Sequence, residues 1–151
     1  AEVVNLHSEA LEFEAIHRVV TESDTDKLMA DMTAALKLTE GASGQSFTVL
    51  LNGVRKQYSV GAPTANLTVG SLQMFLDKWL CENAGKIDYI HGEDVVENLS
   101  SAKGSIGFLL PSMTKEELFP TVIKDGALPR KTFSMGHAHD KRFYCEARKI
   151  R

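Results

Sequence analysis

The stretch "SFTVLLNGVRKQYSV" (residues 46–60) carries the clearest local signal in the sequence and indicates the class of the fold. Two strand-forming runs flank Asn52 and Gly53, a pair that favours the two-residue type I′ turn of a β-hairpin. We therefore predict an antiparallel hairpin here, with the remaining elements arranged around it.

Helical patterns lie on both sides of the hairpin. Over residues 21–38, an apolar stripe at helical spacing follows Asp24 or Thr25, either of which can cap the helix. Over residues 67–85, Thr68 is the expected cap and Gly85 the expected C-terminal glycine.

Two shorter helices are expected further along the chain. One covers residues 93–102, where valine and leucine recur on one side. The other covers residues 114–126, where Thr114 and Glu117 have the spacing of a capping box and Pro120 should kink or shorten the helix.

Further strands are predicted from β-branched residues and alternation, over residues 2–7, 11–20, 86–92, 105–111 and 141–150. Together with the hairpin and about four helices, they predict an α+β fold with a mixed or mostly antiparallel sheet. We expect one compact domain over residues 1–151. The chain opens with Ala1 directly in strand-like sequence, so we expect it to be the C-terminal fragment of a longer protein.

Composition narrows the function classes. The net charge is −3 and the pI about 6.0, which argues against a generic nucleic-acid binder. Cys81 and Cys145 are too few for a disulfide framework and are expected to be buried thiols of a cytoplasmic protein. No apolar run approaches the ~20 residues of a membrane span, so no membrane partner is expected.

The stretch "DGALPRKTFSMGHAHDKRFYCEARKIR" (residues 125–151) is basic in an otherwise acidic chain. Basic side chains, hydroxyls and glycine backbone together suit the recognition of phosphate or carboxylate groups. The candidate ligand-binding residues are Arg130, Lys131, Ser134, Gly136, His137, His139, Lys141 and Arg142. The alternative is a solvated basic strand with ordinary turns, because no known phosphate-loop motif is present.

Two histidines of this stretch, His137 and His139, alternate as strand residues on one face do. They could meet one metal ion, but a zinc site needs three or four ligands and the spacing supplies no others. Two exposed loop histidines are the competing interpretation, and we assign neither a metal nor another cofactor.

The stretch "DYIHG" places Asp88 and His91 at the end of a predicted strand, before a glycine and a helix. This is a common position for functional residues, and a histidine is a suitable acid or base near neutral pH. Asp88 and His91 are therefore the candidate catalytic residues. The alternative is that Asp88 caps a turn and His91 packs in the interior. The pair His17-Arg18 has the weakest case of all.

Four stretches, "DYIHG", "GFLLP", "LFPTVIKDGALPRK" and "FSMGHAHDKRFYCEARK", resemble the C-terminal part of a bacterial and archaeal family known as domain of unknown function 1015. The resemblance implies a missing N-terminal half similar to the ParB and sulfiredoxin group, which includes nucleotide-binding members. It also implies genes beside serine biosynthesis, hence a nucleotide or phosphorylated metabolite rather than DNA. The family usually has glutamate where this chain has His137, which weakens a metal pair, and it provides no agreed catalytic residues.

Two functions follow as hypotheses. In the first, the chain binds a nucleotide or another phosphorylated small molecule. In the second, it is a non-catalytic interaction or homodimerisation module attached to the ParB-like half, with the apolar hairpin and the edge strands as contact surface.

Overall fold

A six-stranded antiparallel sheet lies at the centre of the computed structural model, which describes residues 5–9 and 11–136. The strand order is β3-β5-β4-β7-β2-β6. The strands are β2 (His17–Thr21), β3 (Leu38–Glu40), β4 (Ser46–Leu51), β5 (Val54–Val60), β6 (Lys86–Ile90) and β7 (Ile106–Leu109). Every pairing in it is antiparallel, so the predicted α+β class is confirmed.

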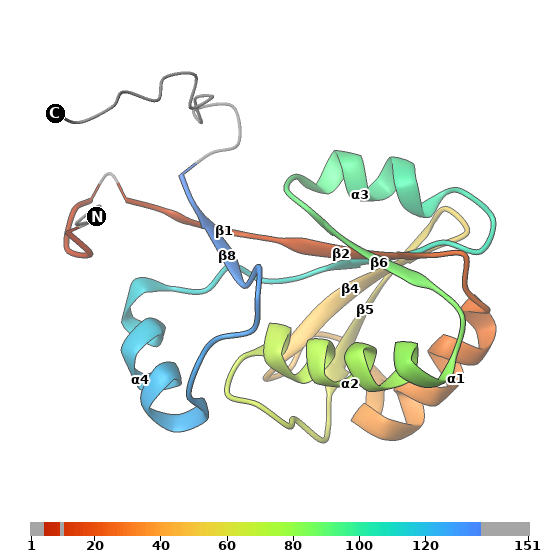
Figure 1. Cartoon of the computed structure of the whole chain (residues 1–151), viewed down its shortest axis with the longest axis horizontal. Helices are drawn as coiled ribbons and strands as arrows, with labels where there is room; N and C mark the ends of the chain where they lie inside the picture. Colours follow the sequence, from red (N-terminus) through yellow and green to blue (C-terminus); the bar gives the residue numbers. More distant parts are fainter. Residues whose placement is uncertain (1–4, 10, 137–151) are drawn as a thin grey trace, which may run out of the picture.

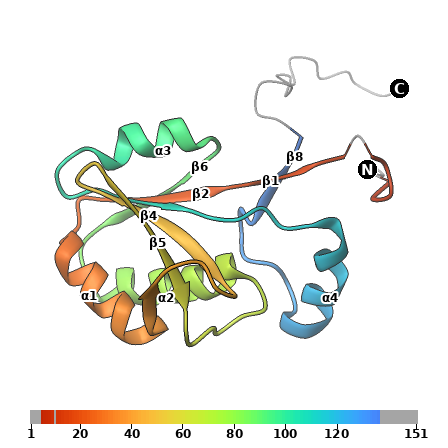
Figure 2. The same cartoon turned by 180° about the vertical axis from the view of Figure 1, so that it is seen from behind.

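Helices cover both faces of this sheet (Figures 1 and 2). α1 (Thr25–Leu36) and α2 (Thr68–Glu82) lie together on one face, and α3 (Glu93–Ser100) lies on the other. α4 (Lys115–Asp125) lies beyond the end of the sheet, beside a two-stranded ribbon of β1 (Phe13–Ala15) and β8 (Phe133–Met135). None of the helices in the described part of the chain combines the length and apolar character needed to cross a bilayer.

The hairpin forms where the sequence predicts it. Leu51 pairs with Val54, and Asn52 and Gly53 both take positive φ, at 52° and 74°, as a type I′ turn requires. The hairpin strands are inner strands of the sheet, since β5 also pairs with β3 and β4 with β7.

Two apolar cores stabilise the layers. The larger lies between the sheet and α1 and α2, with Val20, Phe47 and Phe108 packed near Leu72 and Leu76. The smaller lies under α3 and consists of Val19, Leu50, Val96 and Leu109. A Cβ at Gly107 of β7 would lie 2.7 Å from Val96 Cγ1, so glycine at this position lets α3 approach the sheet closely.

The strand predicted over residues 11–20 is divided at Ile16 and changes partners there. β1 pairs with β8 in the ribbon, whereas β2 pairs with β6 and β7 in the main sheet. The strand predicted over residues 2–7 is wrong for its described part, because residues 5–7 belong to a turn. The strand predicted over residues 141–150 lies outside the described residues.

Several helix ends differ from expectation. Asp24 caps α1 as predicted, accepting a hydrogen bond from Lys27 N. Leu67, not Thr68, is the N-cap of α2, and it provides no side-chain cap. Gly85 lies beyond the C-cap Asn83, whose extended backbone, with φ of −132° and ψ of 157°, ends the helix earlier.

The capping box of Thr114 and Glu117 is confirmed. Pro120 does not shorten α4, which continues to Asp125. Cys81, predicted to be buried, is exposed on the outer side of α2.

Candidate functional site

Polar and titratable side chains gather where the chain passes from the ribbon into the main sheet. They form three groups: a buried arginine network around Arg18, a cavity lined by two histidines, and a cavity at the N-terminus of α2. The first group positions the backbone, and the other two offer space for a ligand.

Arg18 is fully buried, with 0% of its surface exposed. Its Nε donates to Gln73 Oε1 at 3.1 Å, its Nη2 donates to the carbonyl of Arg130 at 3.3 Å, and its Nη1 donates to the carbonyl of Ile16. These bonds connect β2 to α2, to the loop before β8 and to the joint between β1 and β2. Arg18 therefore holds four segments in one arrangement.

Burial lowers the pKa of Arg18 to about 10, because a low-polarity surrounding disfavours the charged form. Tyr89 and Asp77 act in the opposite direction, and Arg130 adds a further, smaller lowering. The carboxylate of Asp77 reaches the network through Gln73, whose Nε2 donates to Asp77 Oδ1 at 2.7 Å. At neutral pH the buried guanidinium consequently keeps its charge.

Tyr89 lies between two arginines. The guanidinium carbons of Arg18 and Arg130 are 5.0 Å and 5.1 Å from the centre of its ring, and Arg130 Nε donates to its hydroxyl at 2.9 Å. The predicted ligand-binding residue Arg130 is therefore partly engaged in holding the fold. Lys131, next to it, is exposed and has a left-handed backbone with φ of 57°.

A cavity of about 390 Å³, here called the histidine chamber, is lined by Glu14, His17, His91, Glu93 and Ser112, with Ala15, Gly92, Leu110 and Pro111 completing its wall. His91 Nε2 contacts Glu14 Oε2, and the side chains of this pair are 19% and 28% exposed. His91, predicted as a candidate catalytic residue, thus borders a cavity and is also partly buried, as the alternative interpretation expects.

His17 is 5% exposed. The backbone directly after β7 orients its ring, because Leu110 N–H donates to His17 Nδ1 at 3.1 Å. Since Nδ1 accepts this bond, the proton of the neutral ring is on Nε2. Burial lowers the pKa of His17, and the charges of Arg18, His91 and Arg55 lower it further, against the raising effect of Glu93. His17 is accordingly a neutral hydrogen-bond donor toward the chamber.

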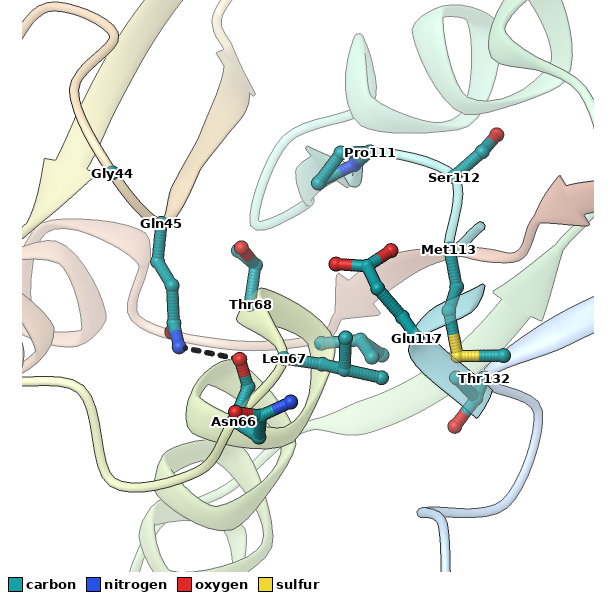
Figure 3. A pocket seen from close by; sticks show the side chains of 11 residues that line it. Gly44, Gln45, Asn66, Leu67, Thr68, Pro111, Ser112, Met113, Glu117 and Thr132 are labelled. Carbon is teal, nitrogen blue, oxygen red and sulfur yellow. Dashed lines mark hydrogen bonds between the residues drawn. The ribbon is translucent and has the colours of Figure 1, made fainter. Parts of the chain in front are cut away.

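The second cavity, here called the α2-terminal cavity, has a volume of about 300 Å³ and is shown in Figure 3. Polar side chains of Gln45, Asn66, Thr68, Ser112, Glu117 and Thr132 line it, with Gly44, Leu67, Val69, Pro111 and Met113. The start of α2 carries no side-chain cap, so the N–H groups of Thr68 and Val69 remain available to a bound group, whereas Gly70 and Ser71 donate to the carbonyl of Leu67. Gln45 Nε2 stabilises the preceding loop by donating to the carbonyls of Ala65 and Asn66.

The predicted site residues are brought together only in part. Ser134 of β8 is buried and pairs with Glu14 in the ribbon, and the side chain of Glu14 contacts His91. Gly136, with φ of 72°, donates its N–H to the carbonyl of Glu12 and thus closes the ribbon. Ser134 and Gly136 are therefore next to β1, whose residues Glu14 and Ala15 line the chamber.

Asp88 is separate from these groups. It is exposed on β6, its Oδ1 accepts from Tyr89 N at 2.8 Å, and it lines neither cavity. His137, His139, Lys141 and Arg142 lie outside the described residues. Within residues 5–9 and 11–136, no three His, Cys, Asp or Glu side chains are grouped to hold a metal ion.

Sequence reasoning missed Glu14, and it ranked His17 and Arg18 last. α3 packs on one face of β2, and Gln73 of α2 bonds Arg18 on the other, so His17 and Arg18 are enclosed. An arginine beside two valines in an apolar strand was the available signal, because such a residue needs a buried partner.

Comparison with known proteins supports the fold. No family model matches the chain, and no protein with a curated description matches it. Among solved structures, the chain is similar to a free serine kinase, determined as a mutant in complex with AMP, with a TM-score of 0.63 and 14% sequence identity. The match covers 89% of this chain and 57% of that one, so this chain spans little more than half of its neighbour.

Replacing Arg18 with lysine should destabilise the protein by ~2–4 kcal/mol. Three different guanidinium nitrogens bond Gln73 and the two carbonyls, and the single nitrogen of lysine cannot reach all three acceptors. Urea unfolding measures this loss. The matched control is Arg55→Lys, since Arg55 makes exposed ion pairs with Glu93 and Glu97 and its replacement should cost less than ~1 kcal/mol. Equal losses for the two variants would show that Arg18 has no special role.

The lowered pKa of His17 should make stability depend on pH. Below about 6.5 the unfolded chain takes up the proton first, so the free energy of unfolding should fall as the pH drops from 6.5 toward the folded pKa. His17→Asn keeps an acceptor for Leu110 N–H but cannot titrate. Urea unfolding at pH 7.5 and 5.0 should show a smaller decrease for this variant, and an identical decrease would exclude the assignment.

Proposed function

We propose that this chain binds a nucleotide or a related phosphorylated small molecule, with the phosphate at the N-terminus of α2. The observation that carries this proposal is the uncapped start of a 15-residue helix opening into a cavity with hydroxyl and amide side chains. The N–H groups and dipole of a helix N-terminus attract anions, and Thr68 and Ser112 add hydroxyl donors. The hydroxyl of Thr132 instead donates to the carbonyl of Pro129 at 2.6 Å.

Two further observations support the proposal. The structural neighbour is a kinase with AMP bound, which makes a nucleotide the first ligand to test on this fold. The basic pair Arg130-Lys131 directly precedes Thr132, which lines the cavity, so positive charge lies close along the chain. Charge of this kind attracts phosphorylated ligands.

Glu117 opposes an anion in the same cavity. Its Oε2 accepts from Thr114 N at 2.8 Å as part of the capping box of α4, on the side facing Thr68 (Figure 3). We place the phosphate next to Thr68 and the α2 backbone, on the wall of the cavity across from this carboxylate. Glu117 then limits the affinity for the most highly charged ligands.

Isothermal titration with AMP, ADP, O-phospho-L-serine and inorganic phosphate tests the proposal. Thr68→Val should weaken binding of the phosphorylated ligand about tenfold by removing one donor, whereas Glu117→Gln should strengthen it. Thr33→Val, at an exposed position of α1, is the matched control. The proposal fails if none of the four ligands binds at millimolar concentration, or if the variants at positions 68 and 33 behave alike.

Self-association is the second candidate function, and the exposed side of α4 favours it. Phe119, Val122 and Ile123 are 62%, 41% and 84% exposed, and their spacing puts them on one helix face. The hairpin and the edge strands were expected to make this contact. However, β4 and β5 are inner strands, and the exposed residues of β5 include Arg55 and Lys56, so α4 is the better surface.

Analytical ultracentrifugation distinguishes the two surfaces. If α4 joins two copies, Ile123→Glu should shift a dimer to monomer, because a charge would be buried at the contact. Val54→Glu, at the exposed hairpin tip, should leave the dimer intact. A wild-type chain that is monomeric at tens of micromolar would remove this candidate.

A further inference from the structure

The histidine chamber and the α2-terminal cavity adjoin each other, since Pro111 and Ser112 line both. A ligand larger than a phosphate ion can therefore leave its phosphate at α2 and extend past Ser112 into the chamber. The proposed function concerns the first cavity alone and assigns no role to the second.

The chamber offers one donor in a fixed position. His17 Nδ1 is occupied by Leu110 N–H, which leaves Nε2–H as the free donor of the neutral ring. Among the described residues, no hydrogen-bond partner is found for Nε2. None of their side-chain nitrogens is both fully buried and without a partner, so Nε2 is in contact with open space. His17 is almost fully buried, so its Nε2 reaches open space through the chamber that it lines.

Acceptors lie across from this donor. Glu14 contacts His91, and a carboxylate has about four lone-pair positions, so it can accept a ligand hydroxyl in addition to its protein partners. Ser112, at the boundary of the two cavities, can donate or accept. A hydroxyl group needs both a donor and an acceptor, and the chamber supplies both.

The charges that line the chamber indicate which end of the ligand lies there. The chamber contains the carboxylates of Glu14 and Glu93, of which Glu93 also pairs with Arg55 and Glu14 contacts His91. Carboxylates disfavour a phosphate beside them but accept hydrogen bonds from neutral hydroxyls. Carboxylates hold the ribose hydroxyls of nucleotides in many other sites for the same reason. The phosphate is thus expected at α2 and the neutral polar part of the ligand in the chamber.

We infer that the histidine chamber binds the 2′ and 3′ hydroxyls of a ribose whose 5′-phosphate lies at the N-terminus of α2. Glu14 accepts from one hydroxyl, and His17 Nε2–H donates to one of them. This inference rests on the proposed function, and it names the ligand class as a ribonucleotide rather than a phosphorylated metabolite without a sugar diol.

Isothermal titration of the full chain with AMP and with 2′,3′-dideoxyadenosine 5′-monophosphate tests the inference, with inorganic phosphate as a third ligand. The wild-type protein should prefer AMP about tenfold or more. Glu14→Gln removes the charged acceptor, and His17→Asn keeps an acceptor for Leu110 N–H but is too short to place a donor at the position of Nε2. Each variant should bring this preference close to one.

Glu116→Gln, an exposed carboxylate on α4, is the matched control and should keep the wild-type preference. Using two variants protects the test against one that does not fold, which circular dichroism reveals. Equal binding of AMP and its dideoxy analogue by the wild-type protein overturns the inference and leaves the proposed function standing. Absence of binding by all three ligands overturns the phosphate site, and the inference with it.

Discussion

The buried guanidinium of Arg18 is the interaction on which the other parts of this structure depend. Removing an ion from water costs several kcal/mol even after the surroundings relax, so such a group persists only when its donors are satisfied. Here its three hydrogen bonds reach α2, the Arg130 loop and the Ile16 joint, and its face lies against Tyr89 of β6. Parts of the chain that are far apart in sequence consequently share one fixed point.

The hydrogen bonds of Arg18 also determine the geometry of the candidate site. His17 precedes Arg18 on β2 and faces the opposite side of the sheet, so the same strand fixes both the network and the chamber. Gln73 anchors the helix whose N-terminus lines the second cavity. The carbonyl of Arg130 holds the loop that continues to Thr132. The arginine network therefore helps to position residues that line both cavities.

Local features were predictable from the sequence because they depend on neighbouring residues. The turn at Asn52-Gly53, the Asp24 cap and the Thr114–Glu117 box all follow from short-range chemistry. The division at Ile16 was not predictable, since it is set by strands that lie 70 or more residues away, and residues 11–20 look uniform in isolation. The basic loop was identified by composition alone, which could not show that Arg130 would pack on Tyr89 or that Glu14 would meet His91.

The order of strands in the sheet also determines how the chain can fold. The hairpin of β4 and β5 joins residues close in sequence and can form early, whereas Val19 of β2 pairs with Asp88 and Gly107. β2 therefore has no partner until most of the chain has been synthesised, and contacts between such distant residues make folding slow. During synthesis, His17 and Arg18 leave the ribosome before β6 and β7, the strands that pair with β2. The two polar residues that position the site therefore stay hydrated until these later strands pair with β2.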